Sequence, residues 1–268
     1  MKSTGNSDPF LRARALFRNH LLHASADNSL TLLAAQALAS APTTRRRRIG
    51  RILRCPTPSC QGLIFKFYGK HRYFDRLRPS RARLAYAAGL TLRDLGIPTV
   101  EPVGFVENTP EIAPFDSCLV MREKPGAVHL REWLRRHRNH MTEDSWRAWR
   151  QQVCEAWLQL GRVGVYHDDT KALNLLTDAS WSPKPRFLVW IDLESVHAGR
   201  RPGLRGVLRN LVQLNGSLRK WVPNTERFAF LEQASAEYPW LAQKWVPWVI
   251  RWWTRRRLRH EVRTRCGP

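Results

Sequence analysis

The chain reads Gly-Val-Tyr-His-Asp-Asp-Thr-Lys-Ala-Leu-Asn-Leu-Leu at residues 164–176, and this stretch decides the fold. It places His167, Asp169 and Asn174 within one short segment. A second apolar run further along the chain ends at Asp192. We expect a tight loop from Asp169 to Asn174, followed by two short apolar strands, the second of which delivers Asp192 to the same place.

These residue types suit one kind of chemistry. Phosphoryl transfer needs a carboxylate that orients the attacking hydroxyl, and amide and carboxylate oxygens that hold Mg²⁺ against the phosphates of ATP. The order His, Asp, Asn and a later Asp is that of kinase-fold phosphotransferases. The alternative is that His167 and Asp169 only cap a turn between a helix and a buried hairpin.

Length and charge limit the possible partners. A chain of 268 residues is long enough for two lobes or one large domain. The net charge of +23, carried mostly by arginine, indicates an anionic partner or surface. Phosphorylated lipids, nucleotides and nucleic acids all fit this charge. Composition alone favours nucleic acid over membrane, but the segment 164–176 reverses that order.

The cysteines and the apolar segments indicate a cytoplasmic protein. The five cysteines follow no zinc-binding pattern, so we expect reduced thiols; they are Cys55, Cys60, Cys118, Cys154 and Cys266. No signal peptide is visible, and the longest apolar candidate, 30–41, is too short to span a bilayer. We expect a cytoplasmic monomer.

Periodicity and capping residues predict a mixed chain of helices and strands. The expected helices are 9–22, 29–39, 79–95, 130–137, 146–163, 205–218, 225–238 and 240–259. The expected strands are 52–53, 63–68, 100–106, 117–121, 173–176 and 187–191. Lys66 stands alone in the apolar strand 63–68, where it either reaches solvent or points its ammonium at a phosphate. The charged segment 122–126 contains Pro-Gly and is typical of a linker.

Several stretches together resemble the lipopolysaccharide-core kinase family and, within it, the Kdo (3-deoxy-D-manno-octulosonic acid) kinases. They are 65–68, 80–83 with 95–102, 119–127, 164–176, and 209–211 with 226–228. The resemblance implies an α+β, protein-kinase-like bilobal fold with a small β-rich N-lobe and a larger helical C-lobe. It also implies the use of ATP and Mg²⁺, and a sugar hydroxyl of an anionic glycolipid of the bacterial inner membrane as acceptor.

The same resemblance assigns the catalytic loop. Asp169 is expected to be the catalytic base, and Lys171 to neutralise the transferring phosphoryl group. Asn174 and Asp192 are expected to hold Mg²⁺, with Asn174 thereby also contributing to nucleotide binding.

The nucleotide site is assigned in the same way. Lys66 is expected to bind the α- and β-phosphates. Met121 takes the gatekeeper position, and the backbone around Glu123 is expected to bond adenine. The expected domains are an N-terminal helical extension, the N-lobe, and the C-lobe with its basic, Trp-rich C-terminal helix; they cover residues 1–42, 43–123 and 124–268.

Two departures from the kinase pattern put activity in question. The helix after Lys66 has no acidic residue between Arg76 and Arg93 to pair with the lysine, which could leave it mobile. No glycine-rich loop precedes Lys66, and the basic run Arg45–Arg48 could grip phosphates instead. A weakened pseudokinase is therefore one alternative. After Asp192 comes Leu-Glu, and Glu194 could assist the metal or cap the next segment.

The C-terminal segment combines tryptophans with arginines. Trp245, Trp248 and Trp252 share one face of the predicted helix, accompanied by arginines such as Arg251 and Arg255. This face could pack in a core, or it could lie at a membrane with indoles at headgroup depth and arginines on lipid phosphates. Base stacking with nucleic acid is a third, disfavoured reading.

Two rival functions share these features. A protein kinase or an aminoglycoside-type phosphotransferase would use the same loop, but such enzymes have no need for a charge of +23 or a Trp/Arg tail. A non-catalytic basic binding module would keep the fold without turnover. Fold alone does not decide between these functions.

Overall fold

The computed structural model describes residues 8–27, 29–40, 51–54, 61–69, 78–199 and 202–265. The chain forms two units, Met1–Pro125 with Asp192–Gly199, and Gly126–Ile191 with Arg200–Pro268. The basic run Arg45–Arg48 and three of the cysteines (Cys55, Cys60 and Cys266) lie outside the described residues. The other two, Cys118 and Cys154, are buried free thiols, as expected.

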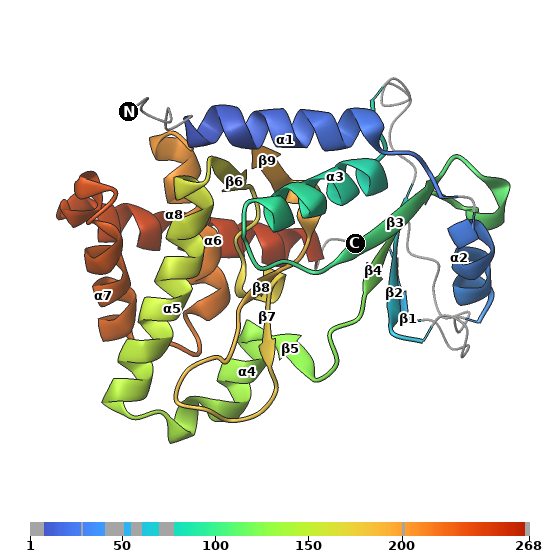
Figure 1. Cartoon of the computed structure of the whole chain (residues 1–268). Helices are drawn as coiled ribbons and strands as arrows, with labels where there is room; N and C mark the ends of the chain where they lie inside the picture. Colours follow the sequence, from blue (N-terminus) through green and yellow to red (C-terminus); the bar gives the residue numbers. More distant parts are fainter. Residues whose placement is uncertain are drawn as a thin grey trace, which may run out of the picture. The chain divides into compact units, whose positions relative to one another are not determined.

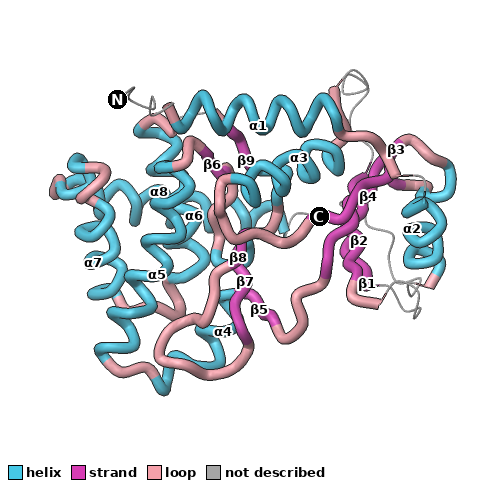
Figure 2. The backbone as a smooth tube through the Cα atoms, in the orientation of Figure 1, coloured by secondary structure: helices cyan, strands magenta, loops and turns pink. Residues whose placement is uncertain are grey.

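The first unit is built on a four-stranded antiparallel sheet (Figure 1). Its strands are β1 (Arg51–Arg54), β2 (Leu63–Gly69), β3 (Pro102–Glu107) and β4 (Phe115–Arg122). Their order in the sheet is β1-β2-β4-β3, so β2 and β4 are the central strands. In Figure 2 these strands are the magenta segments nearest helix α2.

Strand β2 alternates between two environments. Phe65 and Phe67 are fully buried in a core that also contains Leu30 and Ala34 of helix α2 (Ser29–Ala39). Lys66 lies between the two phenylalanines, so its side chain leaves the strand on the opposite face. The alternation of side chains along the strand therefore separates Lys66 from the apolar core.

Helix α3 (Arg81–Asp94) covers part of this unit. Ser80 caps its start by accepting a hydrogen bond from the Arg83 amide. At Gly89 an added Cβ would lie 2.8 Å from a Pro102 side-chain atom and 3.0 Å from Leu193, so this helix approaches β3 and the 3₁₀ turn η6 (Leu193–Ser195) closely.

The remaining elements of the first unit surround α3 and the sheet. They are α1 (Pro9–His23), η3 (Pro110–Ile112) and β9 (Val196–Ala198). His20 of α1 bonds the Asp94 carboxylate at the end of α3 at 2.8 Å.

The second unit is mainly helical. Its helices are α4 (Leu130–His137), α5 (Glu143–Arg162), α6 (Leu204–Leu218), α7 (Asn224–Ala234) and α8 (Trp245–Arg265), with 3₁₀ turns η4 (Arg138–His140), η5 (Ala172–Asn174) and η7 (Pro239–Ala242). A three-stranded sheet has the order β5-β7-β8 and consists of β5 (Ala127–His129), β7 (Leu175–Asp178) and β8 (Val189–Trp190). The strand β6 (Val165–His167) precedes the loop that contains Asp169.

Two of the expected helices differ from the structure by four or more residues at one or both ends. The expected helix 225–238 ends at Ala234, and Pro239, which restricts the backbone of Tyr238, starts a separate 3₁₀ turn. The expected helix 240–259 accordingly begins only at Trp245 and continues to Arg265. In the described part of the chain, no helix is both long and apolar enough to cross a bilayer.

The exposed face of α8 decides between the readings of its tryptophans. Trp245, Trp248 and Trp252 are 44%, 66% and 43% exposed, whereas Val246 and Ile250 of the same helix are buried. Core packing is therefore wrong for these three indoles. The buried apolar residues of α8 include Val246 and Ile250, which lie away from the three exposed indoles around the helix.

Candidate active site

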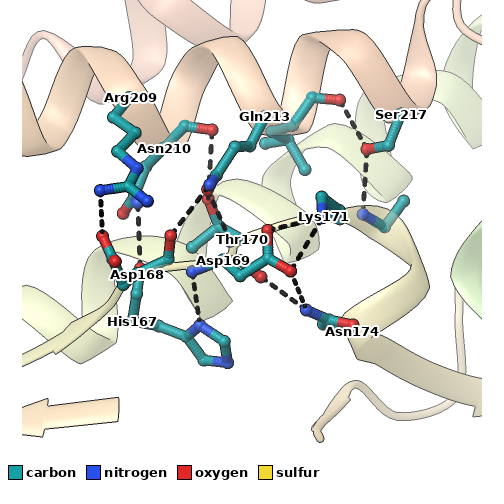
Figure 3. Close-up of polar contacts among 12 residues, drawn as sticks. His167, Asp168, Asp169, Thr170, Lys171, Asn174, Arg209, Asn210, Gln213 and Ser217 are labelled. Atoms are coloured by element: carbon teal, nitrogen blue, oxygen red, sulfur yellow. Dashed lines mark hydrogen bonds and ion pairs between the residues drawn. The ribbon is translucent and has the colours of Figure 1, made fainter. Parts of the chain in front are cut away.

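The loop after β6 gathers three of the expected site residues. Lys171 Nζ lies 2.9 and 3.0 Å from the two carboxylate oxygens of Asp169. Asn174 Nδ2 donates to the Asp169 backbone carbonyl at 2.7 Å and to its carboxylate at 3.1 Å (Figure 3). The carboxylate of Asp169 is thus fixed by a cation and an amide from its own loop, and the Asn174 amide oxygen is directed away from it.

His167 connects the loop to the residue that follows β8. Its side chain is nearly fully buried, with the ring against Trp190. Nδ1 accepts a hydrogen bond from the Asp169 amide at 3.1 Å, and Nε2 donates to the Ile191 carbonyl at 3.2 Å. These two bonds require the neutral ring with its proton on Nε2. His167 is therefore a positioning residue that sets the backbone of Asp169.

Helix α6 binds the same loop from the other side, as Figure 3 shows. Asn210 Nδ2 donates to the His167 carbonyl at 3.0 Å. Gln213 accepts from the Thr170 amide at 3.0 Å and donates to the Asp168 carbonyl at 2.9 Å. Because Asn210 and Gln213 are almost completely buried, these bonds replace the hydration of the loop backbone.

A third residue of α6 extends this support. Ser217 Oγ accepts from the Ala172 amide at 3.0 Å. Asn210, Gln213 and Ser217 are spaced by three and four residues, so they share one face of the helix. Sequence reasoning missed them as functional positions. The feature of the sequence that could have revealed them is a row of polar residues on a helix whose other buried residues are apolar.

Two adjacent aspartates have different partners. Asp168 accepts from Tyr166 Oη at 2.9 Å and pairs with Arg209 at 3.0 Å. Asp169 instead faces Lys171 and Asn174. Asp168 therefore anchors the loop to α6, whereas the Asp169 carboxylate bonds only within the loop in these contacts.

In the first unit, Lys66 is held by two carboxylates. Its ammonium pairs with Asp192 and donates to both oxygens of Glu194 at 2.8 Å. Its side chain is 15% exposed. Tyr68 completes the cluster, since its hydroxyl donates to Glu194 at 3.2 Å and its ring centre lies 5.1 Å from the ammonium.

This cluster explains how Lys66 is paired although the helix that follows it has no acidic residue to offer. The expectation that Lys66 is left mobile is wrong, because Asp192 and Glu194 supply the negative charge from a distant segment. Burial raises the pKa of the Glu194 carboxyl, and Lys66 opposes that rise. Burial also raises the pKa of Tyr68, so its hydroxyl remains a donor.

Asp192 has an unusual backbone. Its φ of 66° and ψ of 49° lie in the left-handed region, which non-glycine residues rarely adopt. Such strain is typical of functional sites, where surrounding contacts maintain it. The salt bridge to Lys66 is one of those contacts.

The expected adenine-binding linker follows β4. Met121 is buried and pairs in register with Ile64. The Glu123 amide donates to the Gly62 carbonyl at 2.6 Å, and its carboxylate pairs with Arg54 at 2.8 Å. The amide of Glu123 is thus already bonded within the first unit.

The donor chemistry suits Mg²⁺. No three His, Cys, Asp or Glu side chains of the described stretches cluster as a ready-made metal site. Mg²⁺ usually takes only one or two protein carboxylates and completes its shell with phosphates and water. Asp192 offers such a carboxylate in the first unit, and Asn174 offers an amide oxygen in the second.

Comparison with known proteins supports a kinase. The model of the lipopolysaccharide kinase (Kdo/WaaP) family matches residues 68–234. A solved structure of WaaP in complex with acyl carrier protein is similar, with 20% sequence identity and a TM-score of 0.61, over 86% of this chain and 95% of that chain. This likeness confirms the expected kinase-like fold. Among proteins of curated function, none matches in sequence.

Proposed function

Because the chain belongs to the lipopolysaccharide kinase (Kdo/WaaP) family and is a kinase, we propose that it uses ATP and Mg²⁺ to phosphorylate a sugar hydroxyl of a lipopolysaccharide-core-type glycolipid. The observation that carries this proposal is the Asp169 carboxylate, held by Lys171 and Asn174 in a loop anchored to α6. A carboxylate fixed in this way can orient an attacking hydroxyl.

The proposed reaction uses the residues of this loop. The acceptor oxygen forms a bond to the γ-phosphorus, the bond from that phosphorus to the departing ADP oxygen breaks, and the hydroxyl proton passes to Asp169. Lys171, within 3.0 Å of Asp169, stabilises negative charge on the transferring group. Asn174 and Asp192 would hold Mg²⁺, which when bound neutralises phosphate charge.

The first unit would bind the nucleotide. Lys66 would contact the α- and β-phosphates, preorganised by Glu194 and Tyr68. Adenine would lie against the linker after Met121. Since the Glu123 amide bonds Gly62, adenine would use other backbone groups of the linker or displace that bond.

A glycolipid acceptor also calls for contact with its membrane. The exposed indoles of α8 accompany exposed arginines such as Arg256 and Arg259, a combination that suits the anionic headgroup region. We place peripheral contact with the cytoplasmic face of an anionic membrane at this helix face.

Substitution of Asp169 tests the catalytic assignment. Asp169→Asn should lower ATP-dependent phosphorylation of a panel of lipopolysaccharide precursors by about 10²-fold or more, the usual scale for a lost general base. ATP binding and melting temperature should stay unchanged. Asp144→Asn is the matched control, because that side chain is 87% exposed. Activity of Asp169→Asn within a few-fold of the parent would remove the loop from the chemistry.

A further inference from the structure

A second polar site lies in the helical unit, away from the catalytic loop. It is a cleft of about 270 Å³ where the end of α6 and the start of α7 meet α8, and every charged residue that lines it is a cation. The lining residues are Asn215, Arg219, Lys220, Asn224, Arg227, Arg251, Thr254 and Arg255.

These cations have no acidic counterpart. Among the described side chains, no carboxylate pairs with any of the five. The nearby Glu226 of α7 is already taken, since it pairs with Arg150 at 2.6 Å and both side chains are largely buried. A cluster of like charges repels itself, and it is stabilised when an anion binds between its members.

Arg227 is held by two asparagines that also line the cleft. One terminal nitrogen donates to Asn215 Oδ1 at 2.6 Å, and the other donates to Asn224 Oδ1. Asn215 in turn donates to the buried Thr254 hydroxyl at 2.9 Å. Arg227 Nε is buried and has no hydrogen-bond partner in the described structure. Burial lowers the pKa of Arg227, and repulsion from Arg251 lowers it further.

We propose that this cleft binds a phosphate group, supplied either as free phosphate or as the phosphate-bearing headgroup of a lipid. One guanidinium group can bind two phosphate oxygens at once. Here several guanidinium groups line one cleft together with side-chain amides and a hydroxyl. The adjoining apolar cavity, which shares Arg227 and Arg251, holds only about 60 Å³. That volume is too small for an acyl chain, so recognition is of the anionic head.

The proposal does not depend on the catalytic assignment, and the test keeps the two apart. Binding of inorganic phosphate to the full chain would be measured by calorimetry at constant ionic strength, with acetate as the comparison anion. Arg251→Gln combined with Arg255→Gln should weaken phosphate binding about tenfold or more, the scale of lost charge-assisted hydrogen bonds. Both positions are exposed on α8, so the fold should be kept.

The matched control removes the same charge elsewhere in the unit. Arg131→Gln combined with Arg205→Gln, both exposed and outside the cleft, should leave phosphate affinity within twofold. Equal losses in both double variants, equal binding of acetate, or no loss in either variant would each overturn the proposal. Lys66→Ala should retain binding at the cleft, whatever it does to catalysis.

Vesicle binding distinguishes a lipid headgroup from free phosphate as the ligand of the cleft. Phosphatidylcholine vesicles with and without phosphatidic acid would be compared using the parent and the Arg251/Arg255 double variant. A cleft that accepts a lipid headgroup predicts binding to phosphatidic acid that the double variant loses and that free phosphate displaces at its own dissociation constant. Vesicle binding that phosphate does not displace lies outside the cleft and identifies the free anion as the ligand of the cleft.

Discussion

Lys66 needs a carboxylate partner, because an ammonium whose side chain is only 15% exposed has lost most of its hydration. Kinases usually supply that partner from the helix that follows the lysine strand. Here the corresponding helix has no acidic side chain until Asp94 at its end, which bonds His20. Glu194 takes the place of that partner, and Asp192 adds a second charge.

The two carboxylates should have separable effects. Glu194→Gln should weaken ATP binding about tenfold with and without Mg²⁺, because it removes the charged acceptor that orients Lys66. Asp192→Asn should cause a larger loss in the presence of Mg²⁺ than in its absence, because Asp192 is the proposed metal ligand. Calorimetric titration of ATP in both conditions measures the difference. Identical patterns for the two variants would mean that Asp192 and Glu194 share one role.

Single residues differed in how far the sequence could predict them. Asp169, Lys171 and Asn174 lie within one loop, so their spacing predicted the cluster that the structure forms. The contact between Lys66 and Glu194 joins residues 128 positions apart, and no local pattern encodes such a pair. The sequence showed only that a partner was missing from its usual helix.

At the scale of elements, α6 supports the proposed catalytic loop. Gln213 bonds both the amide of the buried Thr170 and the Asp168 carbonyl. Gln213→Ala leaves these two groups unsatisfied, at a cost of about 1–3 kcal/mol each. We expect a lower melting temperature and a lower turnover rate with nearly unchanged ATP affinity.

Thermal melting and steady-state kinetics check this prediction. Gln151→Ala on α5 is the control, since that glutamine is exposed and the same substitution removes no loop contact. If Gln213→Ala abolished turnover without any change in melting, Gln213 would contact the substrate instead of positioning the loop.

The bounds of some helices could be predicted closely from capping residues and apolar spacing. The bounds of α2 and α4 agree with the sequence-based expectation, and α6 differs by one residue. The helix start at Trp245 was missed because Pro239 opens a separate turn whose length depends on tertiary packing. The side of α8 that is buried was also missed, because spacing shows that indoles share a face but not which face meets the core.

At the scale of the whole molecule, the net charge of +23 is larger than the catalytic loop requires. Charge of one sign attracts anionic surfaces over a distance set by ionic strength. In the helical unit, this charge coincides with exposed indoles on α8, where Trp248 and Trp252 stack with ring centres 6.4 Å apart and Arg256 lies over Trp252. Exposed indoles and arginines are therefore found together on this helix.

Membrane contact through this face makes a prediction opposite to that of a core helix. A buried tryptophan replaced by alanine costs about 3–5 kcal/mol of stability. Trp248 is 66% exposed, so Trp248→Ala with Trp252→Ala should leave the melting temperature nearly unchanged while weakening binding to vesicles that contain acidic lipid. Trp181→Ala, an exposed indole outside α8, is the control and should bind like the parent.

Binding of the parent should also fall steeply with salt, because each arginine near the surface contributes about 1 kcal/mol that screening removes. Vesicle co-sedimentation across a salt series measures both effects, and full vesicle binding by the double tryptophan variant would show that the membrane is contacted elsewhere.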